Sequence, residues 1–156
     1  MSRGFDARAK TRLKKFHSLG YKNIIDLWII DSYTVDKSFS QNQLEEIASK
    51  LSNPITQEYI LRTEKIKVKP KKEFAFVIEI GFLPGVTDNV AHTAGEIIED
   101  GLKVKFKETE GVYTSQITFL VGKISKQETE SIALSMHNPL IQRSHIKSYA
   151  EFVKDG

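Results

Sequence analysis

The sequence predicts an α+β protein made of two tandem copies of one module. Two segments of the chain, residues 40–57 and 125–142, align with each other without gaps. Each copy alternates segments of helical period with segments rich in β-branched and aromatic residues. We expect the order strand, helix, strand, strand, helix, strand, with both helices on one face of the sheet. The two modules would then pair within the chain as a pseudo-dimer.

The internal repeat sets the expected domain boundaries. Its identities are Ser40/Ser125, Glu45/Glu130, Ile47/Ile132, Ala48/Ala133, Asn53/Asn138, Pro54/Pro139 and Gln57/Gln142. All of these pairs are separated by 85 positions, and Asp6 lies opposite Asp88 at a separation of 82. We therefore predict a first module over residues 1–63, a lysine-rich connector over 64–72 and a second module over 73–156.

The first copy begins with a predicted helix over residues 8–21. Its apolar positions, three residues apart, are Leu13, Phe16 and Leu19. Gly20 is expected to end the helix as its C-cap. Residues 23–30 and 31–37 supply two predicted strands, Ser40 caps the next helix, and residues 55–63 form the last strand.

A strand is missing from the first copy. Only three residues precede Gly4, which lies opposite Gly85, so no segment corresponds to the strand over residues 74–82. A sheet without that strand exposes unpaired backbone groups. We expect either a truncated chain start or a second chain that fills the gap, for example in a homodimer formed through the incomplete first module.

The second copy opens with the strand over residues 74–82 and a turn containing Pro84 and Gly85. Thr87 or Asp88 is expected to cap the following helix, and Gly101 to end it. The predicted apolar face of this helix consists of Val90, Ala91, Ala94, Ile97 and Ile98. Residues 112–116 and 117–121 then form strand structure, either joined by a turn or continuous.

The second helix of this copy begins at Ser125. Glu128 follows three residues later, which is the capping-box pattern. Its predicted apolar positions are Ile132, Ala133 and Met136. Pro139 ends the helix, because the residue before a proline is driven out of the helical conformation. Residues 140–148 are expected to form the last strand.

Composition excludes several classes of function. The chain has no cysteine, which excludes disulfides, cysteine-bound zinc, iron–sulfur clusters and thiol catalysis. Its apolar stretches are too short for a membrane span, and no signal peptide is evident, so we expect a cytoplasmic protein. The net charge of +3 comes mostly from clusters near residues 8–15 and 62–72. No aromatic residue is interleaved in the second cluster, which favours a solvated connector over nucleic-acid binding.

Several segments carry a family resemblance. They are FLPGVTDNVAHTAGEIIEDGL, VYTSQ and NPLIQRSHIKS in the second copy, and HSLGYKNIIDLWIIDSYTVD and KLSNPITQEYIL in the first. Together they resemble the PurS-type small subunit of phosphoribosylformylglycinamidine synthase. The closer resemblance is to the duplicated PurS-like region at the front of fused forms of that enzyme. It extends over almost the whole chain, apart from the missing first strand.

The resemblance implies a role in the fourth step of de novo purine synthesis. That enzyme converts formylglycinamide ribonucleotide to its amidine with ATP and with ammonia from glutamine. The PurS part of the family carries no catalysis. It bridges a PurQ-type glutaminase and a PurL-type synthetase and helps align the path of ammonia. We therefore expect this chain to bind no cofactor itself, with ATP and glutamine used by its partners.

The sequence suggests interface residues rather than a catalytic or metal site. None of the four histidines shows metal-ligand spacing, and Gly85 alone does not make a phosphate loop. The candidate interface residues are Pro84, Gly85, Asp88, Asn89, His92, Tyr113, Asn53, Pro54, Asn138 and Pro139. Two alternative functions remain: a regulatory module that binds a small ligand, and a basic adaptor for nucleic acid.

Overall fold

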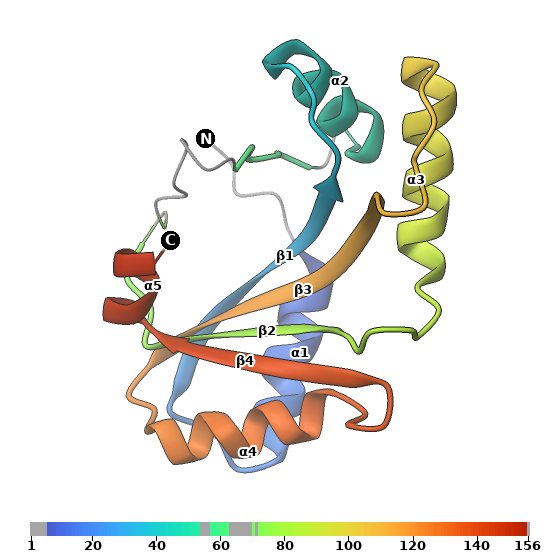
Figure 1. The fold of residues 1–156 in the computed structure, drawn as a ribbon. Helices are drawn as coiled ribbons and strands as arrows, with labels where there is room; N and C mark the ends of the chain where they lie inside the picture. The colour runs from blue at the N-terminus through green and yellow to red at the C-terminus, as the bar shows by residue number, and fades with distance from the viewer. Residues whose placement is uncertain (1–5, 54–56, 63–69, 71, 156) are drawn as a thin grey trace. The chain divides into compact units, whose positions relative to one another are not determined.

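The computed structural model describes residues 6–53, 57–62, 70 and 72–155. These residues form five helices and a four-stranded antiparallel sheet, which confirms the α+β class (Figure 1). The elements are α1 (Ala7–Ser18), β1 (Ile24–Asp36), α2 (Gln41–Leu51), β2 (Phe76–Phe82), α3 (Asn89–Leu102), β3 (Gly111–Gly122), α4 (Lys126–Met136), β4 (Gln142–Ser148) and α5 (Tyr149–Asp155).

The described residues divide into two compact units. The first unit contains α2, α3, the part of β1 from Tyr33 onward and the part of β3 up to Thr114. The second unit contains α1, α4, α5, β2, β4 and the remaining parts of β1 and β3. Each unit therefore draws elements from both copies of the repeat. The predicted modules 1–63 and 73–156 stay predictions.

The strand order in the sheet is β1-β3-β2-β4. Strand β2 is antiparallel to both of its neighbours, with Phe76 opposite Leu120 of β3 and Ser148 of β4. Strand β3 is continuous over twelve residues, so of the two expected alternatives the continuous one is confirmed. Strand β1 is likewise one strand of thirteen residues, and the two strands predicted there are wrong. Asp31, at the expected break, lies within β1, where its carboxylate accepts hydrogen bonds from other elements.

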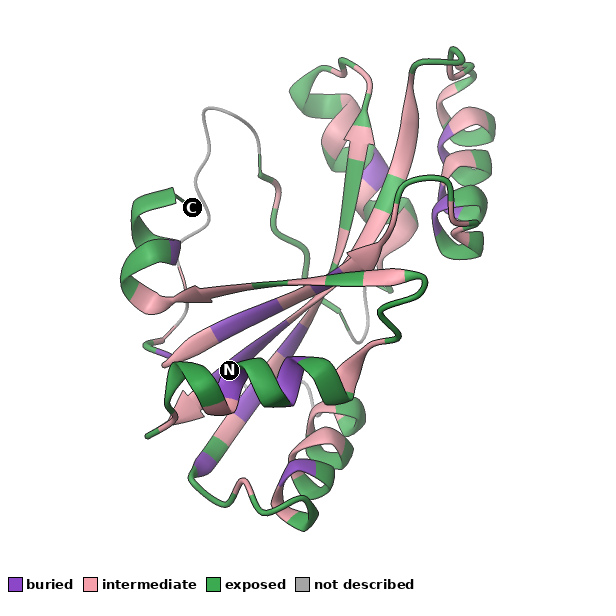
Figure 2. Ribbon diagram, turned by 60° about the horizontal axis from the view of Figure 1, so that its bottom comes forward, coloured by how far each residue is buried: buried purple, intermediate pink, exposed green. Residues whose placement is uncertain are grey.

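One face of the sheet in the second unit packs against α1 and α4 (Figure 2). Phe16 of α1 and Ile132 of α4 are almost fully buried there, together with Ile78 of β2 and Leu120 of β3. The predicted apolar positions of α4 are confirmed, since Ala133 is buried and Met136 packs against the same cluster. In α1, Leu13 packs against the cluster, but Leu19 is half-exposed.

The opposite face of the same sheet is covered by α5, a helix that the sequence analysis did not predict. Trp28 stacks on Phe119 with ring centroids 4.6 Å apart, and Phe74 and Phe152 pack edge-on around them. Helix α5 is an addition to the two helices expected in each module, and the expectation that those two lie on one sheet face stays a prediction. The physical reason for the added helix is the run of large apolar residues that alternates onto this second face, because it needs its own cover from water.

The first unit has a smaller core. Helix α2 packs against α3, and the buried apolar side chains are Ile47 of α2 with Ala91, Ala94 and Ile98 of α3. These residues confirm most of the predicted apolar face of α3. Val90 and Ile97, which were assigned to that face, are instead exposed.

Helix caps agree with the sequence at most positions. Ser40 and Ser125 both form complete capping boxes, and Asp88 caps α3. Gly101 is not a cap: α3 continues to Leu102 and ends at Lys103, which adopts the left-handed conformation with φ of 56°. The C-cap of α1 is Leu19, and the predicted Gly20 follows it with φ of 96°.

The end of the first copy also differs from prediction. Residues 57–62, the described part of the expected last strand, contain no strand. In the second copy the corresponding strand β4 pairs with β2. Within the described residues, no strand of the first copy corresponds to β2, so the last segment of that copy has no such pairing partner there. Residues 55, 56 and 63 of this prediction lie outside the described residues.

Most of the predicted connector, residues 64–72, lies outside the described residues. Its described members are Pro70 and Lys72. The Lys72 ammonium forms an ion pair with the Asp26 carboxylate and lies 5.1 Å from the centre of the Trp28 ring. This lysine therefore contacts the second unit rather than only solvent.

Candidate interaction surface

Asp88 joins the beginning of α3 to the beginning of β3. Its Oδ1 accepts a 2.9 Å hydrogen bond from the Ala91 amide, and its Oδ2 accepts bonds from the Thr114 amide at 3.2 Å and the Thr114 hydroxyl at 2.6 Å. A carboxylate with three donors in this arrangement satisfies one of the unpaired amides at the helix start and fixes the neighbouring strand. Asp88 is therefore an anchor for the surface around it.

Other candidate interface residues near this anchor are exposed to solvent. Asn89 is exposed, and the His92 side chain is 76% exposed with its Nε2 3.4 Å from the Glu96 carboxylate. Tyr113 precedes Thr114 on β3 and is 57% exposed, as is Val90 on α3. The start of α3 in the first unit thus carries Asp88, Asn89 and His92. Tyr113 is exposed on the side of β3 that faces away from this helix, because Thr114 bonds Asp88 and Val112 lies against Gly95 of α3. Exposed aromatic side chains are enriched in protein-binding surfaces.

In the same unit, an ion pair joins the adjacent ends of β1 and β3. Lys37, directly after β1, donates to the Glu110 carboxylate at 2.8 Å, and Glu110 directly precedes β3. The Lys37 hydrogen bond lowers the pKa of Glu110, and a backbone hydrogen bond from Lys107 lowers it further. Glu110 is therefore ionised at neutral pH and holds the strand ends together.

Pro84 and Gly85 form the exposed turn after β2, in the second unit. The Val86 amide donates to the Leu83 carbonyl at 3.2 Å, and Gly85 has a φ of 81°, which an L side chain rarely adopts. The glycine is explained by this turn geometry, and Pro84 is exposed beside it.

The Asn138 turn between α4 and β4 is stiffened by hydrogen bonds. The Asn138 amide donates to Gln142 Oε1 at 3.0 Å, the Gln142 amide donates to the Asn138 carbonyl at 2.8 Å, and the Leu140 amide donates to Asn138 Oδ1 at 3.0 Å. Pro139 is exposed, and Leu140 at the tip is 83% exposed. The turn thus presents a large apolar side chain to solvent in a defined position.

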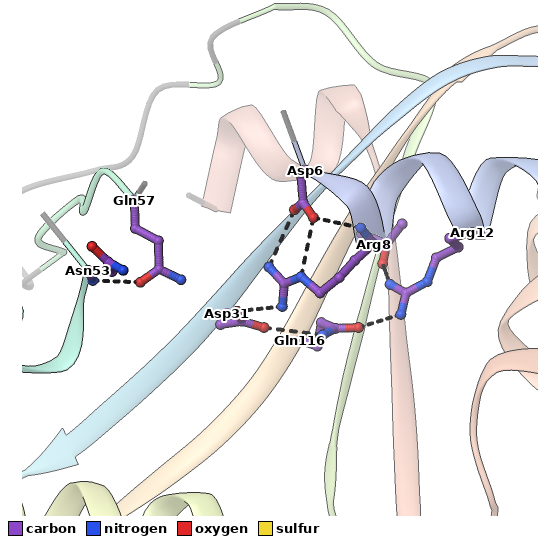
Figure 3. Close-up of polar contacts among 8 residues, drawn as sticks. Asp6, Arg8, Arg12, Asp31, Asn53, Gln57 and Gln116 are labelled. Carbon is purple, nitrogen blue, oxygen red and sulfur yellow. Dashed lines mark hydrogen bonds and ion pairs between the residues drawn. The ribbon is translucent and has the colours of Figure 1, made fainter. Parts of the chain in front are cut away.

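The first copy repeats part of this turn. The Asn53 amide donates to Gln57 Oε1 at 2.8 Å, and the Gln57 amide donates back to the Asn53 carbonyl at 2.8 Å (Figure 3). These are the same two bonds that join Asn138 and Gln142. Pro54 lies outside the described residues. The repeated letters Asn-Pro-x-x-Gln therefore correspond to the same pair of hydrogen bonds between asparagine and glutamine, with Asn53 in the first unit and Asn138 in the second.

A polar network in the second unit was not predicted. Arg12 of α1 donates to the Thr118 hydroxyl at 2.8 Å and to Gln116 Oε1 at 2.6 Å, and Gln116 donates to Asp31 at 3.1 Å. Arg8 donates to the same Asp31 carboxylate at 2.8 Å (Figure 3). Arg8 and Arg12 belong to the basic cluster near residues 8–15, and both attach α1 to β1 and β3.

The two arginines differ electrostatically. The hydrogen bond to Asp31 raises the pKa of Arg8. Burial lowers the pKa of Arg12, and the positive charge of Arg8 lowers it further. Both remain charged at neutral pH because a guanidinium starts from a very high pKa. The only sequence signal for this network is the spacing of four residues between Arg8 and Arg12, which places them on one face of α1.

An open hollow of about 400 Å³ lies at the end of α2 in the first unit. It is lined by Ser49, Ser52, Gln57, Glu58 and Tyr59. Of these, Gln57 also accepts the hydrogen bond from the Asn53 amide, so the hollow adjoins one candidate interface residue.

The described residues also bear on metal binding and on membrane crossing. Within the described residues, no three histidine, cysteine, aspartate or glutamate side chains gather so that they could hold a metal ion. None of the helices in the same part of the chain combines the length and the apolar character needed to cross a bilayer.

Comparison with known proteins gives no assignment. No protein-family model matches the chain, and no curated protein matches its sequence.

Proposed function

We propose that this chain is a non-catalytic, PurS-like bridging part of phosphoribosylformylglycinamidine synthase. It would dock the glutaminase and the ATP-dependent synthetase in the cytoplasm and help align ammonia transfer between them. The proposal rests on the sequence resemblance and on one contact, the hydrogen bond between Asp31 and Gln116.

That contact supports an internal pairing of the two copies. Asp31 and Gln116 occupy the same position in the two copies, since 85 residues separate them. In a symmetric pair, a residue contacts its own counterpart only where the two-fold axis passes. Trp28 lies three residues before Asp31, and it stacks on Phe119, three residues after Gln116. Both contacts fit an antiparallel pairing of β1 and β3 that is symmetric about the contact between Asp31 and Gln116.

Fusion of two copies makes such a pairing intramolecular. A single-module subunit must associate with a second copy at its cellular concentration, whereas a tandem chain has a high effective concentration of its second module. The tandem arrangement therefore provides a stable, two-sided scaffold, which is the property that a bridging component needs.

Two surfaces are the proposed docking sites. One is the region where α3 and β3 begin, with Val90 exposed on the helix and Tyr113 exposed on the strand. The other is the Asn138 turn, with Leu140 exposed at its tip. Both present apolar side chains from a hydrogen-bonded backbone, so docking would order few additional groups and lose little conformational entropy.

The test is reconstitution with a synthetase that lacks its PurS part and with the matching glutaminase. We expect the chain to co-purify with the synthetase and to restore amidine formation from glutamine. Activity with added ammonium salt should depend on the chain much less, because free ammonia does not need the bridge. Absence of both co-purification and rescue would show that the proposal is wrong.

Surface variants locate the docking sites in the same assay. Leu140→Asp and Tyr113→Asp should each lower affinity for a partner by about tenfold or more, since a charge replaces a buried apolar contact. Val153→Asp is the matched control, because Val153 on α5 is 53% exposed and lies outside both proposed surfaces. If the control weakens binding as much as the other two, the assignment of these surfaces is wrong.

A further inference from the structure

Two turns of the second unit lie side by side at one end of its sheet (Figure 1). The turn after β2 contains Pro84, and the turn before β4 contains Pro139 and Leu140. The Leu83 amide donates to the Ile141 carbonyl at 2.9 Å, which joins the two turns directly. We call residues 83–86 and 138–141 the turn pair. The sequence indicated both turns as interface segments but did not predict that they are neighbours.

The turn pair presents apolar side chains on a fixed backbone. Leu140 is 83% exposed, Ile141 is 40% exposed, and both prolines are exposed. Hydrogen bonds between Asn138 and Gln142 hold the turn before β4. Exposed apolar side chains that gather in one place mark an interaction site. A partner bound to this surface would order few additional groups, so little conformational entropy would be lost.

The strand that follows the turn pair adds a positive charge. Arg143 of β4 is exposed, and within the described residues its guanidinium has no ion pair and no hydrogen bond. The β2 residue opposite Arg143 is Gly81, so no side chain of that strand opposes it. Residues 80–86 and 131–148 contain no aspartate or glutamate. The segments that form this surface therefore bring a cation and apolar groups but no carboxylate.

The one acidic residue of β2 is already bonded to another strand. Glu79 lies opposite His145 in the register of β2 and β4, two positions from the pair of Gly81 and Arg143. Its carboxylate accepts a hydrogen bond from the Ser115 hydroxyl of β3 at 2.5 Å. Strand β2 thus supplies no carboxylate to Arg143.

We propose that the turn pair and Arg143 bind a protein segment that places a carboxylate beside a large apolar side chain. The apolar side chain would pack against Leu140 and Ile141, and the carboxylate would form a charge-assisted, bidentate pair with the guanidinium. Arginine is enriched among the residues that contribute most to binding at protein interfaces. This partner chemistry belongs to one of the two proposed docking sites, and it rests on the proposed function in treating the Asn138 turn as such a site.

Two other anionic partners fit this surface less well. Recognition of anionic lipids uses clusters of about four to eight lysines and arginines, whereas Arg143 is the one such residue between positions 127 and 146. Single-stranded nucleic acid is bound through aromatic side chains on which bases stack. Residues 83–86 and 127–146 contain no phenylalanine, tyrosine or tryptophan. An acidic and apolar protein segment is therefore the occupant that the surface favours.

The experiment selects short random peptides, displayed on phage, that bind the full chain. We expect the enriched peptides to combine aspartate or glutamate with leucine, isoleucine, phenylalanine or tryptophan. A synthetic peptide with the enriched sequence should shift the NMR signals of residues 83, 85–86 and 140–143 in the ¹⁵N-labelled chain, and the shifts should saturate. Signals of α5, on which the proposal places no contact, should stay unchanged.

Charge variants test the role of Arg143. Arg143→Glu should weaken binding of that peptide by about tenfold or more, because two negative charges would then meet. Arg143→Lys should weaken binding less, since it keeps the charge and loses the bidentate geometry. Lys123→Glu is the matched control with the same change of charge. Lys123 is exposed and follows β3 at the opposite end of the sheet from the turn pair.

Four outcomes would overturn the proposal. They are enriched peptides without acidic residues or no enriched peptide, signal shifts centred away from the turn pair, equal effects of Arg143→Glu and Lys123→Glu, and binding to phosphatidylserine vesicles that Arg143→Glu abolishes. Rescue of the synthetase tests the proposed function separately. A chain that restores amidine formation but selects peptides without acidic residues contradicts the partner chemistry alone. A chain that selects acidic, apolar peptides at the turn pair but rescues no synthetase contradicts the enzyme assignment alone.

Discussion

Gly122, the last residue of β3, lies where a side chain does not fit. Its φ is 141°, and a Cβ built there would approach the Asn23 carbonyl oxygen to 2.0 Å. Backbone atoms cannot move aside as a flexible side chain can. Nothing in the sequence around Gly122 distinguishes it from other glycines at strand ends, because the atom that excludes a side chain comes from a residue about one hundred positions earlier.

We expect Gly122→Ala to lower the free energy of unfolding by about 2–3 kcal/mol, from backbone strain and the clash together. Chemical denaturation followed by Trp28 fluorescence measures this, since Trp28 packs in the aromatic cluster of the same unit. Gly111→Ala is the control at the other end of β3, where the nearest atom to an added Cβ is the Tyr113 hydroxyl oxygen at 3.7 Å. Equal losses in both variants would contradict the close approach to Asn23.

The tertiary contacts of Arg12 are a second feature that the sequence alone does not reveal. Arg12 belongs to the basic cluster near residues 8–15, and the structure half-buries its side chain against Thr118 and Gln116. Thr118 is fully buried and polar, and the arginine supplies the donor that its hydroxyl accepts. The requirement for that donor arises only when α1 packs on β3.

Among the local features, the helix caps were predicted best from the sequence. Ser40 and Ser125 were identified from a hydroxyl followed three residues later by Gln43 or Glu128, and both boxes form. The same pattern occurs at Ser148 and Glu151, where the Glu151 amide donates to the Ser148 hydroxyl and the Glu151 carboxylate accepts from the Ser148 amide. This signal could have predicted α5, because a capping box depends on neighbouring residues alone.

Asp88 combines a cap with a tertiary contact, so its removal should cost more than removal of a simple cap. We expect Asp88→Ala to lower the free energy of unfolding by about 2–3 kcal/mol, against about 1 kcal/mol for Ser125→Ala. Thr114→Val removes the hydroxyl donor but keeps the bond between Asp88 and the Ala91 amide. It should lower the free energy of unfolding, but by less than Asp88→Ala does. Urea unfolding followed by circular dichroism gives all three values. A loss in Asp88→Ala no larger than in Ser125→Ala would show that the bonds to Thr114 add nothing.

Strands were less predictable than helices. The sequence located strand structure in both halves of β1 and β3, but the break expected before Asp31 does not occur. A polar residue inside a strand is tolerated when other elements supply its partners, as Arg8 and Gln116 do here. Those partners lie on α1 and β3 and cannot be inferred from the residues beside Asp31.

The two units differ in how much apolar surface they bury. Among the described residues, the second unit contains both apolar clusters, one on each face of its sheet. The buried apolar side chains of the first unit are Ile47, Ala91, Ala94 and Ile98, of which two are alanines. Local stability follows the density of buried apolar contacts.

Native-state hydrogen exchange should therefore separate the units. We expect backbone amides in α2 and α3 to exchange at least about tenfold faster than those in β2 and α4, because less buried surface opposes local opening. Mass spectrometry of peptides from each element measures this at neutral pH. Equal protection of α3 and β2 would mean that the first unit opens only with global unfolding.

The sequence by itself determined the α+β class, the internal repeat, the starts of α2, α3 and α4, and most of the buried helix faces. These features depend on residues within one or two turns of each other, so a linear pattern contains them. Only the tertiary structure decided that α1 and α4 share one apolar cluster, that α5 covers the opposite face, and that Asp31 meets Gln116. Those contacts join residues from about 80 to more than 100 positions apart, and they form only when the whole chain balances burial of apolar surface against the need to pair every buried polar group.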